Sequence, residues 1–311
     1  MFTRQFENSK PLHTFFCVLM IVVTSFVFWF FKNAQEFNLR NVGMLCANLL
    51  IISMTIFLLE FVKSKNRLTK RSSFAVITFS AILIAFPEIL NNTSLLLSNF
   101  FVLLSLRRLL SIRTKAKVKK KIFDSAIWVS VAALFYSWVI LFFIPVFISI
   151  IMFGVVDKKN IWIPFIGALL VFLFLTVYNL LCLDSFWIAE NFDFSVSYDY
   201  TSYATVSKYI QITILLSVVI WLAVFNINIH QKLRIIYRPL QITIWAFIFI
   251  ALMIIVFVNR KNSGEMIFLV PVLSYTLGSF FDFSKDKFFK NVIFVLMLLL
   301  PVLSIRELLY L

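Results

Sequence analysis

Positive charge in this sequence is confined to short clusters that separate long apolar runs. The chain carries 29 Lys and Arg residues against 14 Asp and Glu residues, although 62% of it is hydrophobic and its mean hydropathy is +0.98. The two densest basic clusters lie at 63–71 and 107–121. Apolar runs separated by basic loops are typical of a chain that crosses a bilayer many times and keeps those loops in the cytoplasm.

A soluble domain is excluded by the amount of apolar surface, because folded soluble domains need a largely polar exterior. The segments between the apolar runs are short, so we predict a single integral membrane domain over 1–311 with no separate soluble domain. The bases lie close to the predicted spans, where anionic lipid headgroups are the expected partner. Nucleic-acid binding is therefore not expected.

A membrane-spanning helix needs about 20 mainly apolar residues. Nine runs meet this requirement, at 13–31, 42–62, 73–90, 94–112, 161–182, 208–226, 239–258, 265–281 and 289–308. The run 122–155 is too long for one helix and short for two. A break at Tyr136-Ser137 would give two short spans, the second containing Pro145, whereas one kinked or re-entrant unit would give ten spans or fewer.

The charge distribution favours eleven spans. With eleven spans and a cytoplasmic N-terminus, 23 of the 29 Lys and Arg residues fall inside and eight of the 14 acids fall outside. Treating 122–155 as one crossing would move the bases that follow Lys232 to the outside, against the positive-inside rule. We predict an all-α polytopic transmembrane bundle in the cytoplasmic (inner) membrane, with the N-terminus inside and the C-terminus outside.

The strongest candidate for chemistry is Glu88, in FPEILNNTS at the outer end of the third predicted span. Charged groups at membrane depth are costly and point to function. Pro87 is expected to interrupt the helix there. Asn91, Asn92 and Asn99 follow, and we expect these amides to share an outward-facing pocket with the Glu88 carboxylate. The alternative is that Glu88 reaches water at a helix end while Asn91-Asn92 forms a turn.

Further candidates lie in two other outer segments. Glu36, in the first outer loop, would supply a second carboxylate beside Glu88, although a solvated loop residue is the simpler interpretation. Arg260 and Lys261, in NRKNSGE, place bases on the outside. A bound anion such as a lipid-linked phosphate would explain them, as would a salt bridge to the acidic loop 183–207. That loop is either an interfacial aromatic belt or a ligand-contacting lid.

No metal ion or cofactor is predicted. The three cysteines, Cys17, Cys46 and Cys182, form no C-x-x-C pair and are expected to be buried and inert, and His13 and His230 lie far apart in the sequence. The sequence contains no Walker loop, GxSxG, HExxH or dinucleotide-binding motif. An ATPase, a serine hydrolase or a zinc protease is therefore not expected.

Three segments carry a resemblance to a family: KSKNRLTKRSSFA, FPEILNNTSLLLSNFFVLLSLRRLLSIR and KKKIFDSAIWVSVAALFYSWVILFFIPVF. They resemble an uncharacterised family of bacterial polytopic inner-membrane proteins, from which no activity follows. The paired short spans at 122–155 and the segment NRKNSGEMIFLVPVLSYTLGSFF are similar to the GT-C glycosyltransferase scaffold. That resemblance implies polyprenyl-phosphate sugar donors at the outer face and an acid in the first outer loop, which only Glu36 could match. The characteristic acidic motif, long first outer loop and large C-terminal domain of those enzymes are missing.

Three functions follow as hypotheses. A cell-envelope glycosyltransferase or polymerase would act on a lipid-linked glycan, with Glu36 or Glu88 as base and Arg260 with Lys261 as phosphate clamp. A non-catalytic subunit would serve as a scaffold in an envelope, secretion or motility complex with other membrane proteins. A transporter ranks below these, because the span centres are nearly free of charge and no internal repeat is evident.

Overall fold

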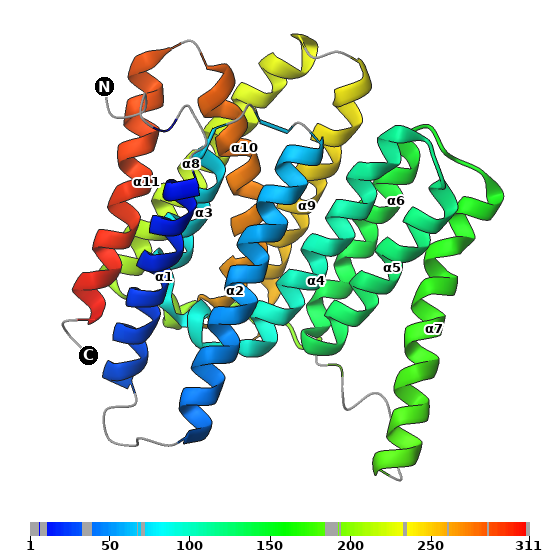
Figure 1. Cartoon of the computed structure of the whole chain (residues 1–311), viewed down its shortest axis with the longest axis horizontal. Coiled ribbons are helices and arrows are strands. Elements are labelled where there is room, and N and C mark those ends of the chain that lie inside the picture. Colours follow the sequence, from blue (N-terminus) through cyan, green and yellow to red (C-terminus); the bar gives the residue numbers. More distant parts are fainter. Residues whose placement is uncertain are drawn as a thin grey trace. The chain divides into compact units, whose positions relative to one another are not determined.

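The chain is built from α-helices that follow the predicted spans closely. The computed structural model describes residues 6, 11–32, 39–66, 68–69, 72–183, 192, 194–232, 235–259, 261–284 and 286–308. Within these ranges it contains eleven α-helices and no strand (Figure 1): α1 (Pro11–Lys32), α2 (Leu39–Asn66), α3 (Phe74–Ala85), α4 (Thr93–Leu110), α5 (Val118–Phe135), α6 (Phe143–Met152), α7 (Lys158–Leu183), α8 (Val206–Lys232), α9 (Arg238–Phe257), α10 (Val270–Phe283) and α11 (Lys287–Leu308).

Short 3-10 helices connect several of these elements: η2 (Pro87–Asn91), η3 (Ser111–Thr114), η4 (Ser137–Phe142), η6 (Thr201–Tyr203), η7 (Ile235–Tyr237) and η8 (Gly264–Phe268). Among the described segments, seven helices are long and apolar enough to cross a membrane, namely α1, α2, α4 with η3, α7, α8, α9 with η7, and α11. The all-α architecture with several potential spans is thus confirmed. The count of eleven crossings and the sides on which the termini lie stay predictions.

The apolar run 122–155 divides where the sequence indicated. α5 ends at Phe135, Tyr136 is extended with φ −153° and ψ 106°, and η4 begins at Ser137. Pro145 lies in the first turn of α6, where its missing N–H removes no helical hydrogen bond, so it does not interrupt that helix.

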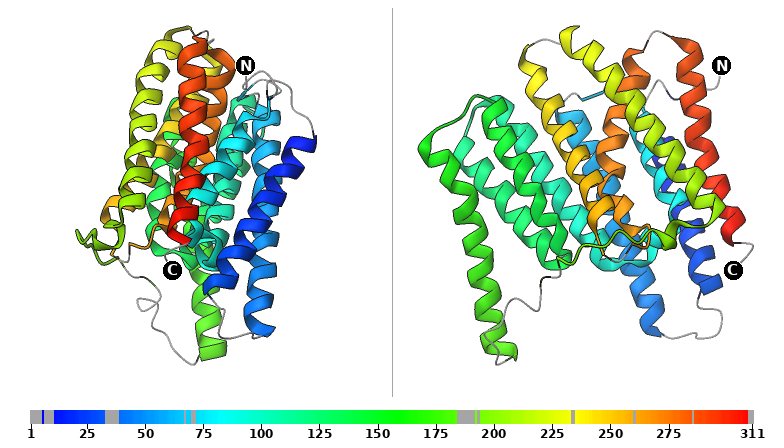
Figure 2. Two further views of the ribbon diagram at one scale, coloured as in Figure 1. Left: turned by 90° about the vertical axis from the view of Figure 1, so that its left-hand side faces the viewer. Right: turned by 180° about the vertical axis from the view of Figure 1, so that it is seen from behind.

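The helices form two compact units, the first of which comprises residues 1–96, 199–232 and 261–311. Its centre is α3, which packs against α1, α10 and α11 and buries nearly every side chain. The ring of Phe74 lies 4.9 Å from that of Phe281, centroid to centroid. Seen from behind, α8 runs alongside α11 and completes this unit (Figure 2).

The second unit comprises residues 97–198 and 233–260. Here α5 packs closely along α7 and α6 packs along α9. The contact between α5 and α7 depends on Gly167, because a Cβ at that position would lie 2.9 Å from the Cβ of Ala126. Interlocking small residues of this kind allow two helices to approach closely within a membrane.

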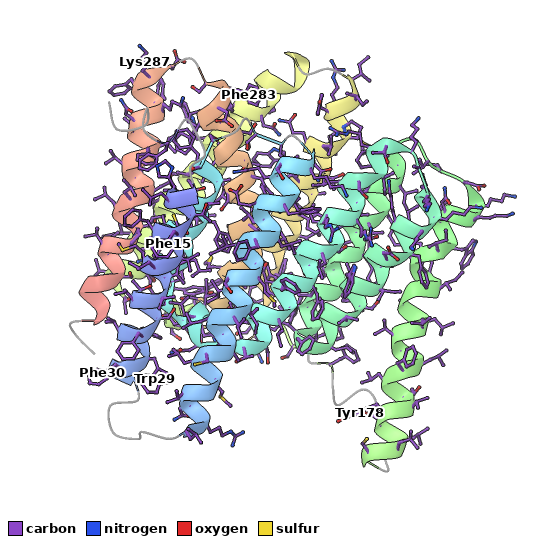
Figure 3. All side chains as sticks on the ribbon, in the orientation of Figure 1. Phe15, Trp29, Phe30, Tyr178, Phe283 and Lys287 are labelled. Atoms are coloured by element: carbon purple, nitrogen blue, oxygen red, sulfur yellow. The ribbon has the colours of Figure 1, made fainter. Side chains whose placement is uncertain are left out.

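Large apolar side chains cover much of the outer surface of the helices. Phe15 and Phe30 of α1 and Tyr178 of α7 point away from their helices and are at least half exposed (Figure 3). Such a surface is compatible with contact to lipid chains. The thiols of Cys46 and Cys182 also lie on exposed positions, so the expectation that they are buried is wrong.

In each unit the basic helix ends gather at one end. In the first unit, Lys63 at the end of α2 is 3% exposed, pairs with Glu60 and donates to the Ser72 carbonyl at 2.8 Å. His13 of α1 lies within 3.0 Å of the Ser73 hydroxyl at the start of α3. The ends of α1, α2 and α3 therefore meet as the alternating topology predicts.

The second unit repeats this arrangement with different residues. Arg108 of α4 pairs with Asp124 of α5 at 3.1 Å, and the Arg113 guanidinium lies 5.1 Å from the Tyr237 ring centroid near the start of α9. Both arginines are therefore held by specific partners, beyond the simple snorkelling to water that a helix-end base allows.

Candidate functional site

The candidate site lies in the first unit, at the end remote from Lys63. Proline forces the residue before it out of the helical conformation, and α3 accordingly ends at Ala85, with Phe86 at φ −121° and ψ 77°. Pro87 then begins η2 and places Glu88 in its first turn. The predicted interruption at Pro87 is thus observed.

Glu88 is held by an ion pair. The Lys208 ammonium, near the start of α8, donates to Glu88 Oε1 at 2.7 Å, and the two side chains are 15% and 26% exposed respectively. The second carboxylate oxygen of Glu88 is buried and makes no hydrogen bond to any described residue. One oxygen of the Glu88 carboxylate is therefore paired with an ammonium group, and the other has no hydrogen-bond donor among the described residues. The carboxylate does not simply reach water at a helix end.

A second carboxyl group approaches from η8, which packs against η2. The turn before η8 is unusual, because Ser263 has φ 65° without being glycine and the Gly264 N–H donates to Asn262 Oδ1 at 3.1 Å. Such backbone conformations are costly and cluster at functional sites. The turn places Glu265 in the interior with 1% of its surface exposed, and its Oε2 has no hydrogen-bond partner in the described part of the chain.

Burial raises the pKa of Glu265 to about 7. Hydrogen bonds from the backbone N–H groups of Glu265 and Asn262 and the charge of Lys261 oppose this shift, whereas the negative charge of Glu88 adds to it. Desolvation and a nearby like charge both disfavour the ionised carboxylate. A buried carboxyl group whose pKa is raised in this way is a candidate for acid–base chemistry.

Part of the acidic loop 183–207 contacts this site. The Lys261 ammonium is 4.4 Å from the centroid of the Tyr200 ring, and the residue is only 4% exposed. Tyr203 is buried, and burial together with the charge of Glu265 raises the pKa of its hydroxyl. The contact between Lys261 and the loop is thus a cation–π interaction. The salt bridge to this loop stays a prediction.

We refer to Glu88, Lys208, Glu265, Lys261 and Tyr203 as the Glu88–Glu265 cluster. In the described part of the chain, the carboxyl group that senses the charge of Glu88 is that of Glu265. Glu36, which the sequence offered as a possible second carboxylate, and Arg260, the predicted companion of Lys261, lie outside the described residues.

The predicted asparagines have separate roles. Asn92 Oδ1 accepts the N–H of Leu95 at 3.2 Å and so caps α4, as N-cap asparagines commonly do. Asn91 is half-buried, and its amide nitrogen has no hydrogen-bond partner among the described residues. Asn99 belongs to the second unit, where it is 1% exposed and its side-chain amide is likewise unpaired within the described chain.

Sequence reasoning missed two residues that shape the site. Asn48 of α2 donates to the Leu90 carbonyl at 2.9 Å and accepts the Thr93 hydroxyl at 2.7 Å, which fixes the end of η2. Lys208 was recognised only as a base on the outer side. The signal for Asn48 is a polar residue within an apolar run, although its partner is not readable from its position.

No cluster of three His, Cys, Asp or Glu side chains able to hold a metal ion occurs in the described ranges. The Glu88–Glu265 cluster presents a carboxyl group with a raised pKa beside a second carboxylate, two ammonium groups and a phenol.

Comparison of the chain with models of protein families, with curated proteins and with solved structures found no match.

Proposed function

We propose that this chain is a multi-pass inner-membrane protein that transfers a sugar from a lipid-linked donor to a hydroxyl at the outer face, in the assembly of the cell envelope. The observation that carries this proposal is the buried Glu265 carboxyl, which has one unengaged oxygen and a pKa of about 7.

Membrane insertion is supported by the seven helices that are long and apolar enough to span. Each unit gathers its bases at one end, and the Glu88–Glu265 cluster lies at the other end of the first unit. Under the positive-inside rule the basic ends are cytoplasmic. Eleven crossings, with the N-terminus inside and the C-terminus outside, then place the cluster at the outer face.

Glu265 is suited to be the general base. A base works best when its pKa lies near the ambient pH, because it is then available in the ionised form and still accepts a proton readily. Glu88 is the weaker candidate, because Lys208 holds its carboxylate in an ion pair. Its negative charge instead helps to raise the pKa of Glu265.

The proposed step moves one proton and one sugar. The acceptor hydroxyl oxygen attacks the anomeric carbon of the donor sugar while its proton passes to Glu265 Oε2. The bond between that carbon and the carrier phosphate oxygen breaks, and the phosphate leaves with the electron pair. A lysine next to this phosphate would stabilise its charge, which is the role we propose for Lys261.

The test compares Glu265→Gln with the matched control Asp286→Asn, which removes an exposed carboxylate outside the cluster. Each variant replaces the natural chain in cells, and mass spectrometry measures the envelope glycans and their lipid-linked precursors. We expect Glu265→Gln to abolish the product and accumulate the precursor at a normal protein level, and we expect the control to behave as wild type.

Unchanged glycans in cells carrying Glu265→Gln would overturn catalysis by this cluster. Stoichiometric co-purification of the variant with another membrane protein would then favour the non-catalytic subunit or scaffold.

A further inference from the structure

Five buried polar atoms in and beside the Glu88–Glu265 cluster retain unused hydrogen-bonding capacity within the described part of the chain. They are Glu88 Oε2, Asn91 Nδ2, the hydroxyl oxygens of Tyr203 and Ser263, and Glu265 Oε2. Buried polar groups in folded proteins are almost always hydrogen-bonded, because an unpaired group loses its bonds with water and gains none. So many unpaired groups in one place indicate a polar ligand or ordered water.

Three short segments of the first unit bring these atoms together. η2 is a 3-10 helix, in which side chains three residues apart eclipse one another, so Glu88 and Asn91 project from the same side. η8 packs against η2, carries Glu265 and is directly preceded by Ser263. Tyr203 joins them from η6, because its hydroxyl group approaches the backbone of Ser263 and senses the charges of both carboxyl groups.

The group of polar atoms extends from the interior of the protein towards its surface. Ser263, Glu265 and Tyr203 are 0%, 1% and 5% exposed respectively, whereas Glu88 and Asn91 are half-buried. The polar lining therefore has a deep end at Glu265 and an end beside η2 that is open to entry.

The charges of the cluster disfavour an ion at these five atoms. Lys208 and Lys261 balance the two carboxylates, so no net charge attracts an ion. An anion would meet the two carboxylate oxygens, and the carrier phosphate therefore belongs beside Lys261 and not here. A metal cation would meet the N–H groups of the Asn91 amide and the two ammonium groups. The lining suits an uncharged ligand.

The unused atoms fit a pair of neighbouring hydroxyl groups. The two carboxylate oxygens need donors and the Asn91 amide needs an acceptor, and a hydroxyl group serves as both. A single hydroxyl group, such as that of a serine side chain in a protein substrate, would leave one carboxylate oxygen without a donor. Two hydroxyl groups on adjacent carbons of a ring supply one donor to each carboxylate.

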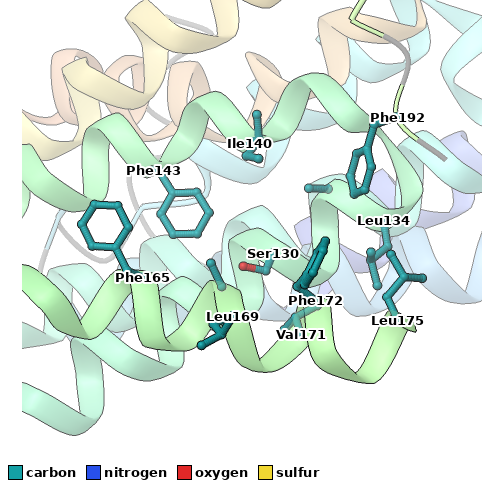
Figure 4. Close-up of a pocket in the computed structure, with 12 residues that line it drawn as sticks. Ser130, Leu134, Ile140, Phe143, Phe165, Leu169, Val171, Phe172, Leu175 and Phe192 are labelled. Carbon is teal, nitrogen blue, oxygen red and sulfur yellow. The ribbon is translucent and has the colours of Figure 1, made fainter. Parts of the chain in front are cut away.

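The apolar pocket of the second unit has the opposite chemistry. Its volume is about 320 Å³, and Phe143, Phe165 and Phe172 are among its lining residues (Figure 4). Its one lining hydroxyl group, that of Ser130, already donates to the Ala126 carbonyl at 3.0 Å. A hydroxylated ring would lose its hydrogen bonds with water there and gain none in return.

We propose that the acceptor is a sugar ring, which the cluster binds through two adjacent hydroxyl groups, one donating to Glu265 Oε2 and the other to Glu88 Oε2. The Asn91 amide and the hydroxyl groups of Tyr203 and Ser263 complete the lining around these two hydroxyl groups. Lys208 holds the Glu88 carboxylate in place for this contact. The inference deepens the proposed function and rests on it for the reaction, although binding is measured without turnover.

The experiment is saturation-transfer NMR on the full chain in nanodiscs of phosphatidylcholine. The probes are the methyl pyranosides of glucose, galactose and mannose. The control ligand is tetrahydropyran-2-methanol, which keeps the ring but has a single hydroxyl group. We expect at least one pyranoside to bind and the control ligand not to bind. Failure of all three pyranosides, or equal binding of the control ligand, would overturn the inference and leave ordered water as the occupant.

Two variants remove single hydroxyl groups from the lining. Ser263→Gly keeps the turn, because glycine adopts a φ of 65° without strain, and Tyr203→Phe keeps the aromatic ring. The matched control Tyr209→Phe removes the hydroxyl group of an exposed tyrosine on α8. We expect the Kd of the pyranoside to rise about fivefold in each site variant, as for the loss of one hydrogen bond, and to be unchanged in the control. An unchanged Kd in both site variants would also contradict the inference.

This measurement is separate from the test of catalysis. Pyranoside binding by the natural chain, together with unchanged envelope glycans in cells carrying Glu265→Gln, would contradict the catalytic role and support the binding site. Loss of glycans in that variant without pyranoside binding would contradict the binding site and support catalysis.

Discussion

Lys208 and Glu88 form an ion pair at 2.7 Å that ties the start of α8 to η2. The pair is partly buried, so its partners depend on one another more than those of an exposed surface pair. The negative charge of Glu88 raises the pKa of Glu265. Because Lys208 offsets part of that charge, it limits this rise in the pKa of Glu265.

Replacing this lysine should therefore have two effects. We expect Lys208→Met to lower the free energy of unfolding by about 1–3 kcal/mol, because it leaves a partly buried carboxylate without its donor. It should also raise the pKa of Glu265 further. Thermal unfolding in detergent measures the first effect, and the double variant Glu88→Gln/Lys208→Met should recover part of the loss. No recovery in the double variant would argue against the pair as the cause.

The stability of the protein should depend on the ionisation of Glu265. Its pKa is about 7 when folded and about 4.5 in the reference state, so between these values the folded chain binds more protons than the unfolded chain. Protonated Glu265 therefore stabilises the folded chain relative to its ionised form. This contribution to the free energy of unfolding is fully present below pH 4.5, and about 3 kcal/mol of it is lost as the pH rises through 7. We expect Glu265→Gln to remove this slope from unfolding measured across that range, and Asp286→Asn to retain it. A slope unaltered by Glu265→Gln would show that other groups cause it.

The contact between Lys261 and Tyr200 should depend on the aromatic face alone. We expect Tyr200→Phe to keep the stability of the protein and Tyr200→Ala to lower it by about 1–2 kcal/mol, because only the second change removes the π surface below a buried ammonium. Unfolding in detergent measures both. If Tyr200→Phe proves as damaging as Tyr200→Ala, the hydroxyl group rather than the ring would be the important part.

Replacing glycine by alanine should destabilise the protein at one helical position and stabilise it at another. Gly167→Ala should cost about 1–3 kcal/mol, since its new Cβ would lie 2.9 Å from that of Ala126. Gly43→Ala, in the exposed part of α2, meets nothing within 4 Å and should stabilise its helix by about 0.5–1 kcal/mol. Thermal unfolding of the two variants side by side checks the prediction. Equal effects would mean that α5 and α7 separate enough to absorb a methyl group.

The helical architecture was readable from the sequence because membrane spans have a long and simple signal. About 20 apolar residues bounded by bases define each one. The division of the run 122–155 at Tyr136-Ser137 was one of two possibilities that its length left open, and the charge distribution favoured it. The 3-10 segments could not be predicted, because they depend on local packing and not on hydropathy. η8, for example, occupies the beginning of the predicted span 265–281.

The candidate site was predicted only in part. Glu88 was identified because a carboxylate beside a proline in an apolar run is conspicuous. Glu265 looked like one more charge in an exposed turn, and its burial follows from the tertiary contact between η2 and η8. The suggestion of Glu36 as a second carboxylate relied on its loop being on the same side as Glu88, which carries no information on distance.

The burial of α3 has a consequence for how the protein is made. At 12 residues the helix rises about 18 Å, well short of the ~30 Å bilayer core. η2 continues it with irregular backbone that lipid would not tolerate and that α1, α2 and η8 cover. The helices α10 and α11, which pack against α3, are synthesised after it. We expect α3 to need a sheltered environment, such as an insertion machinery or the α1–α2 pair, until those two helices are made.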